Sequence, residues 1–114
     1  MSTTAEDSTS YPDDAPLMAL FGPPARTKLV SVFVAERGRD LSVSDVSRQA
    51  NVSRTTVYDH LDDLLELGVI EESRATNDGH STMYELNEES DIAELCYKLE
   101  GVTLRKLLEN DGQV

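Results

Sequence analysis

Small polar side chains gather at the start of one segment, and their chemistry is that of hydrogen-bond recognition. The residues concerned are Ser53, Arg54, Thr55, Thr56, Tyr58 and Asp59. On the first turns of a helix such groups can reach the edges of base pairs, because an α-helix fits the major groove of B-DNA. Arg54 can contact guanine or a phosphate, and Asp59 can accept a hydrogen bond from cytosine N4. These residue types favour nucleic-acid binding over catalysis.

A helix over residues 54–67 would position these side chains. Ser53 can cap its first turn, and Gly68 follows its last. One side of this helix is apolar, and the residues that form it are Val57, Leu61, Leu64 and Leu65. We expect that side to pack against a core, which leaves the polar side free.

A second, shorter helix precedes it. We expect Ser44 to cap a helix over residues 45–50, with Val46 facing inward. The turn 51–53 then joins two short helices, an arrangement typical of a helix-turn-helix. A further helix is expected upstream, over residues 25–37.

The pattern changes from helical to extended after Gly68. Extended runs over 69–75 and 81–86 flank the turn 76–79, whose Asp-Gly pair predicts a β-hairpin. A hairpin directly after a helix-turn-helix is a wing, placed to touch a neighbouring minor groove or phosphate. The wing candidates for DNA contact are Arg74, Asn77 and His80, and Arg48 is a candidate on the shorter helix.

A last helix is expected over residues 91–109, capped by Ser90, and would extend roughly 28 Å. Its apolar residues recur every three or four positions and are Ile92, Leu95, Cys96, Leu99, Val102 and Leu107. So small a domain cannot cover the whole of this helix, so part of its apolar side is expected to meet a second copy. We therefore predict a homodimer with these residues at its interface.

The predicted fold class is α+β and mainly helical, a winged helix-turn-helix with a two-stranded wing and a C-terminal dimerisation helix. Residues 1–16, rich in Ser, Thr, Asp and Pro, are expected to form a disordered acidic tail. Residues 17–87 are assigned to the DNA-binding domain and 88–110 to the dimerisation helix. Residues 111–114 form a short tail.

Net charge is the unusual feature of this sequence. Ten Lys and Arg against 22 Asp and Glu give −12, whereas DNA-binding proteins usually present a basic surface. Residues 23–58 nevertheless carry six basic and three acidic side chains, a local charge of +3. An acidic, lysine-poor composition resembles that of proteins from salt-loving archaea; the alternative is simple solubility through net charge.

Composition and motifs argue against several other functions. No apolar stretch approaches the roughly 20 residues of a membrane span, and residues 1–16 lack a signal or transit pattern, so we expect a cytoplasmic location. The single cysteine, Cys96, and the histidines His60 and His80 have no recognisable metal spacing. Because no catalytic motif is present either, we expect no enzymatic activity, no metal and no cofactor.

Three stretches together resemble the arsenic-repressor (ArsR) type of winged-helix transcriptional regulator, of the kind found in halophilic archaea. The stretches are LFGPPARTKL from Leu20, LSVSDV from Leu41, and SRTTVYDHLDDL from Ser53 with the following LGVIE. The resemblance spans residues 17–87 and implies that five residues enter the major groove, namely Arg54, Thr55, Thr56, Tyr58 and Asp59. It also implies that the wing touches the adjacent backbone. Metal-sensing members carry cysteine pairs or clustered His and Asp, and this sequence has neither set.

Other roles stay open for several of these residues. Tyr58 can pack against the core instead of touching the DNA backbone, and Asp59 can simply face solvent. We expect His60 to pack on the helix flank and His80 to be a turn residue, in preference to binding a ligand. Cys96 is either a small core hydrophobe or a redox sensor.

Two other functions compete with DNA-binding regulation by a homodimer. The first is a winged helix that binds another protein of the transcription machinery, for which an acidic surface would meet a basic partner. The second is a ligand-responsive repressor whose effector the sequence does not identify. The polar start of the 54–67 helix, beside a locally positive segment, favours double-stranded DNA as the partner.

Overall fold

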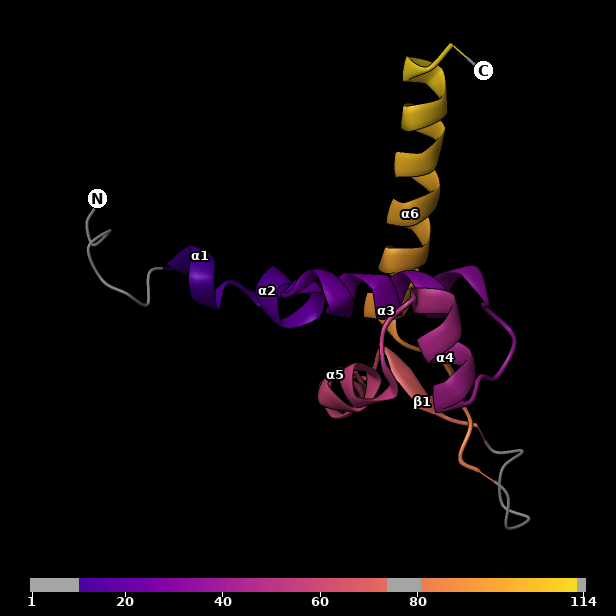
Figure 1. Ribbon diagram of the computed structural model, residues 1–114. Helices are drawn as coiled ribbons and strands as arrows, with labels where there is room; N and C mark the ends of the chain where they lie inside the picture. The colour runs from indigo at the N-terminus through magenta and orange to yellow at the C-terminus, as the bar shows by residue number, and fades with distance from the viewer. Residues whose placement is uncertain (1–10, 74–80, 113–114) are drawn as a thin grey trace.

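The computed structural model describes residues 11–73 and 81–112 (Figure 1). Its elements are α1 (Tyr11–Asp14), α2 (Pro16–Phe21), α3 (Pro24–Ala35), α4 (Val43–Ala50), α5 (Arg54–Glu66), β1 (Ile70–Glu72), β2 (Tyr84–Leu86) and α6 (Asp91–Asn110). Helix α3 lies across α4, α5 and the β1–β2 hairpin, and α6 rises away from it on the other side. The predicted architecture, mainly helical with a two-stranded antiparallel sheet, is confirmed.

Helix α3 supplies the middle of the hydrophobic core. Its Leu29 and Phe33 are almost fully buried, and so are Val57 and Leu64 of α5. The remaining elements contribute to the same core, chiefly through Val46, Val69, Ile70, Leu86, Ala93 and Cys96. Because α3 contacts α4, α5, β2 and α6, it fixes how these elements lie relative to one another.

Helix α4 begins two residues earlier than the sequence predicted, and its N-cap is Ser42 rather than Ser44. The Ser42 hydroxyl accepts a hydrogen bond from the Asp45 backbone N–H, and the Asp45 carboxylate accepts one from the Ser42 N–H, both at 3.0 Å. This reciprocal pair is a capping box. The backbone bond from Ser42, followed by the bond from Arg48, holds the pKa of Asp45 below its usual value. The prediction of Ser44 was wrong because the carboxylate three residues after Ser42 decides where the helix starts.

The capping box predicts that two neighbouring serines respond differently to substitution. Ser42→Ala removes the cap and should lower the free energy of unfolding by about 1 kcal/mol. Ser44→Ala, inside the first turn of α4, should change it by less than about 0.5 kcal/mol. Urea unfolding of both variants beside the wild type measures the difference. Equal losses would show that the capping box does not hold this end of α4.

The connection between α4 and α5 is fixed by local hydrogen bonds. Asn51 ends α4 with a φ of 59°, a left-handed conformation that asparagine tolerates. The Ser47 hydroxyl donates to the Val52 carbonyl, and the Val52 N–H donates to the Ser47 carbonyl at 3.1 Å. Ser53 then caps α5 as predicted, by accepting from the Thr56 N–H at 3.1 Å. The two helices are therefore joined by a short turn that its own side chains hold in place.

The predicted hairpin is present, with shorter strands than the extended runs of the sequence. Strands β1 and β2 pair antiparallel, with Ile70 opposite Leu86, Glu71 opposite Glu85, and Glu72 opposite Tyr84. Tyr84 also exchanges backbone hydrogen bonds of 2.7 and 2.8 Å with Leu41, which ties the hairpin to the segment before α4. The turn 76–79 lies outside the described residues.

The N-terminal region and the end of α3 differ from the predicted boundaries. The sequence predicts a disordered tail through residue 16, whereas the structure has α1 over Tyr11–Asp14 and starts α2 at Pro16. Proline is favoured at the first position of a helix, because its missing N–H has no partner to lose there. Helix α3 ends at Ala35, two residues early, and the chain turns through Gly38, whose φ is 90°.

Helix α6 begins at the predicted cap, where the Ser90 hydroxyl accepts from the Ala93 N–H at 3.1 Å. Only its first turns are covered by α3, through Ala93 and Cys96. The rest of α6 stands clear of the other elements (Figure 1). At its base, the Arg37 guanidinium lies 4.3 Å from the centre of the Tyr97 ring. None of the helices in the described ranges is long and apolar enough to cross a bilayer.

Candidate nucleic-acid interface

The outer side of α5 is open to solvent and carries polar residues that the sequence singled out. Arg54, Thr55, Tyr58 and Asp59 are all exposed, and Tyr58 keeps 59% of its surface accessible. Tyr58 is therefore available for a surface contact and is not part of the core. Among the described ion pairs, none involves Arg54, so its guanidinium is free to meet an external acceptor.

Ser53 and Thr56 differ from these residues because their hydroxyl groups already hold the start of α5. The Ser53 hydroxyl accepts from the Thr56 N–H and lies 2.9 Å from the Thr56 hydroxyl. Thr56 is half-buried. Both side chains therefore orient the first turn, which places Arg54 and Thr55 between them on the open side.

The structure does not place the remaining predicted DNA-contact residues beside the open side of α5. Arg48 is exposed on α4, and its guanidinium donates to the Asp45 carboxylate at 2.9 Å. An exposed pair between residues three apart contributes little, so Arg48 can exchange this partner for a phosphate. Arg74, Asn77 and His80 lie outside the described residues.

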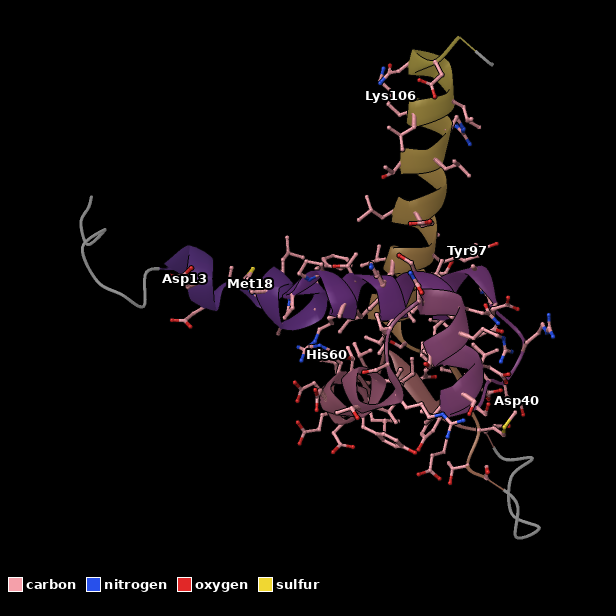
Figure 2. All side chains as sticks on the ribbon, in the orientation of Figure 1. Asp13, Met18, Asp40, His60, Tyr97 and Lys106 are labelled. Carbon is pink, nitrogen blue, oxygen red and sulfur yellow. The ribbon has the colours of Figure 1, made fainter. Side chains whose placement is uncertain are left out.

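A cluster that the sequence did not predict links the middle of α5 to α2 and α3. Arg26 of α3 donates through Nε to His60 Nδ1 at 3.1 Å and forms an ion pair with Asp63. It also donates to the Ala19 carbonyl of α2 at 2.6 Å, and its side chain is only 12% exposed. Figure 2 labels His60 where α5 approaches these two helices. His60 is packed, as predicted, and Arg26 ties three helices together.

The carboxylates of α5 have different surroundings. All four are exposed, but Asp63 forms an ion pair with Arg26. Within the described residues, no ion pair involves Asp59, Asp62 or Glu66. Asp62, Asp63 and Glu66 all lie in the second half of the helix. A helix that enters a groove with its first turns would keep these three acids away from the phosphates.

One side of the hairpin is strongly acidic. Glu71 and Glu85 are directly opposite in the ladder, and Glu88 and Glu89 line the same hollow of about 350 Å³. Burial, followed by the charge of Glu71, raises the pKa of Glu85. Repulsion between like charges directly opposite in a ladder destabilises strand pairing.

Replacing Glu85 by glutamine should stabilise the protein at neutral pH. Because the pKa of Glu85 is raised in the folded state, stability is lost as the pH rises from the ordinary value of 4.5 through the raised pKa. Glu85→Gln removes that loss, so its melting temperature should exceed that of the wild type at pH 7, and the difference should shrink toward pH 4. Glu100→Gln makes the same charge change at an exposed position of α6 that does not line this hollow. Equal gains in both variants, measured by thermal unfolding, would attribute the effect to net charge alone.

Cys96 faces the core rather than the open side of α6. It is buried, so it does not join the exposed residues that were predicted with it as a dimer interface. Burial raises the pKa of its thiol, which disfavours the reactive thiolate. Within the residues that the structure describes, no three His, Cys, Asp or Glu side chains are grouped to hold a metal ion.

Comparison with protein families matches residues 33–74 to the IclR helix-turn-helix domain. The matched stretch runs from the end of α3 through α4 and α5 to β1. It therefore contains the two helices and the turn between them. The arsenic-repressor assignment stays a prediction. None of the curated proteins matches this chain.

Solved structures share the arrangement of most of this chain. Rv0081 of M. tuberculosis is 25% identical, with 91% of this chain and 98% of that chain covered and a TM-score of 0.60. The transcriptional repressor BigR from Xylella fastidiosa is 23% identical over 91% of this chain and 96% of its own, with a TM-score of 0.63. Lactococcus lactis ZitR in complex with DNA is 18% identical, with 75% of this chain and 60% of that chain covered and a TM-score of 0.52.

The fold is a winged helix-turn-helix. Helices α4 and α5 form its helix-turn-helix, and the β1–β2 hairpin is its wing. The open side of α5 is therefore the side that this fold presents to a nucleic acid when it binds one.

Proposed function

We propose that the protein is a sequence-specific, double-stranded DNA-binding transcriptional regulator that acts in the cytoplasm as a homodimer. Helix α5 would enter the major groove, and the wing would lie on the adjacent backbone or minor groove. The observation that carries this proposal is the open side of α5, where a capped helix-turn-helix presents Arg54, Thr55, Tyr58 and Asp59 to solvent.

The comparisons support the same function. The matched family is a helix-turn-helix domain, BigR is a transcriptional repressor, and ZitR has been crystallised with DNA. A winged helix that binds another protein would be favoured by apolar groups on α5. The outward residues of its first two turns are instead an arginine, a threonine, a tyrosine and an aspartate.

The homodimer is proposed from the exposed apolar side of α6. Leu95, Leu99 and Val102 are 65%, 56% and 59% exposed, although they lie in the middle of a well-formed helix. Ile92 and Leu107 of the predicted interface are exposed as well. Soluble monomers rarely leave a continuous apolar patch uncovered. A second copy of α6 would cover this one and would place two α5 helices on successive turns of DNA, about 34 Å apart.

The experiment that tests the function is selection of genomic DNA fragments by the purified protein in concentrated potassium chloride. The comparison is an Arg54→Ala, Thr55→Ala double variant, whose exposed side chains contribute nothing to the core. Enrichment of a shared inverted repeat by the wild type alone is the expected result. Failure of the wild type to enrich any sequence would contradict the proposal and favour a protein partner.

The salt dependence of binding is expected to be shallow or reversed. A protein that neutralises many phosphates loses affinity steeply with salt, because counterions are released on binding. With a net charge of −12, this chain can neutralise only a few phosphates, and close base contacts must supply the affinity. Fluorescence anisotropy of the selected DNA over a series of potassium chloride concentrations measures the slope. A slope as steep as that of a basic repressor would contradict this prediction.

A further inference from the structure

A hollow of about 420 Å³ lies where the start of α4, the first turns of α5 and the residues leading into β2 meet. Its lining is almost entirely hydroxyl groups and one guanidinium, from Ser44, Arg54, Tyr58, Ser81, Thr82 and Tyr84. Ser42, whose own hydroxyl caps α4, completes the polar lining. Val43 is the one apolar residue among the described residues of the lining. Every polar side chain in the lining can donate a hydrogen bond.

None of the described lining residues is a carboxylate, in a chain with 22 acidic residues. Burial, as the largest cause, and the nearby negative charges of Glu72 and Asp62 raise the pKa of Tyr84. The acidic hollow of the hairpin has four glutamates in its lining. The two hollows share no residue, so they lie against different parts of the hairpin. Only the hydroxyl-lined hollow includes residues from the open side of α5, through Arg54 and Tyr58.

We propose that the hydroxyl-lined hollow binds one phosphate group of the DNA backbone, an inference that rests on the proposed DNA-binding function. The hydroxyl groups of Tyr58 and Thr82 donate to the phosphate oxygens, and Arg54 supplies the positive charge. Phosphate oxygens accept hydrogen bonds from Arg, Ser, Thr and Tyr side chains, and such contacts fix the register of a protein on the duplex. The guanidinium of arginine matches a phosphate in a bidentate manner.

The contact also accounts for how an acidic protein can hold a polyanion. Attraction from a distance is weak for a chain with a net charge of −12, and it is screened further in concentrated salt. Short hydrogen bonds from the hydroxyl groups and guanidinium of the described lining do not depend on that attraction. Tyr58 on α5 and Thr82 beside the wing would donate hydrogen bonds to the same phosphate. This shared contact would fix the position of α5 relative to the groove.

The test uses the full chain and the inverted repeat selected by the wild type. The Tyr58→Phe, Thr82→Val double variant removes two hydroxyl groups from exposed side chains while keeping their shapes. The matched control is Ser31→Ala, which removes a hydroxyl from α3 at a position that does not line the hollow. Because a phosphate contact carries no sequence information, the double variant should bind the repeat and a scrambled duplex more weakly by the same factor, about tenfold for each hydroxyl. The control should bind both duplexes like the wild type.

Duplexes with one methylphosphonate at each successive position identify the phosphate itself. The position that weakens the wild type most should have little further effect on the double variant. Unchanged affinity of the double variant, or a loss confined to the repeat, would overturn the proposal, because the hydroxyl groups would then be idle or would read bases. If the wild type binds no duplex, the proposed function fails and this inference fails with it, which is a distinct result.

Inorganic phosphate is the other source of the same chemistry. Titration of the isotope-labelled protein with phosphate, followed through the amide signals of Ser44 and Thr82, measures whether the free ion occupies the hollow. Saturable shifts in the wild type, together with DNA binding that is unaffected in the double variant, would assign the hollow to free phosphate and overturn the proposal. Absence of such shifts with a uniform loss of DNA binding is the expected outcome.

Discussion

Arg26→Ala is expected to lower the free energy of unfolding by about 2–3 kcal/mol, one of the largest effects that a single polar substitution can have in this protein. The side chain is nearly buried, and it donates to His60, to Asp63 and to the Ala19 carbonyl. Its removal leaves the part-buried acceptor His60 without its donor, which is costly, whereas the exposed Asp63 carboxylate and Ala19 carbonyl can turn to water. Loss of the packed aliphatic part of the Arg26 side chain adds to the cost. Urea unfolding followed by circular dichroism measures the change.

Arg39→Ala is the matched control for Arg26. Arg39 is 75% exposed, and its one ion pair among the described residues is with Glu36, three residues earlier. Its loss should therefore change the free energy of unfolding by less than about 0.5 kcal/mol. Arg26→Lys keeps the charge but not the forked geometry, and should recover only part of the loss. Equal effects of the two alanine substitutions would show that Arg26 is not the link between α2, α3 and α5.

Leu95→Gln combined with Leu99→Gln is expected to convert the proposed dimer to a monomer. In a symmetric interface each substitution counts twice, so four leucines lose their burial, at a cost of at least about 4 kcal/mol in association free energy. The fold of the protomer should stay intact, because both side chains are already more than half exposed in it. Binding to the inverted repeat should weaken by at least about a hundredfold, since one α5 then reads only half a site.

Lys98→Gln combined with Arg105→Gln is the control on α6. Both side chains are exposed, and glutamine keeps the helical propensity of the residues that it replaces. Sedimentation equilibrium should find dimers for the wild type and the control, and monomers for the leucine variant. A wild-type protein that sediments as a monomer would remove the basis for the homodimer.

Local sequence patterns predicted those elements whose ends are decided by neighbouring residues. Ser53 and Ser90 were identified as helix caps because a hydroxyl group directly precedes a run with helical spacing, and both accept the expected backbone hydrogen bond. The antiparallel hairpin was predicted from its Asp-Gly pair and extended flanks. The choice between Ser42 and Ser44 failed because two serines had the same hydroxyl, and only the reach of the Asp45 carboxylate separates them.

Contacts between distant residues could not be predicted in the same way. Arg26 contacts His60 and Asp63, which lie 34 and 37 residues further along the chain. No spacing pattern in the sequence predicts contacts over such separations. The hydroxyl-lined hollow gathers residues 42–44 with residues 54, 58, 81, 82 and 84, which become neighbours only once β2 pairs with Leu41. The open residues of α5 were predicted because a helical wheel separates them from Val57, Leu61 and Leu64. The packing of α3 against α4 and α5 then determines which residues of other elements lie beside those of α5.

The burial of Cys96 makes the rate of thiol labelling a measure of local opening in this protein. The sequence contains one cysteine, and it lies at the junction where the first turns of α6 rest on α3. A thiol reagent in solution can react with it only during moments when α6 lifts away or the domain opens. The rate of labelling of the wild-type protein therefore reports how often the protein opens at this junction. Any partner that holds α6 against the domain would lower the rate at which Cys96 is labelled.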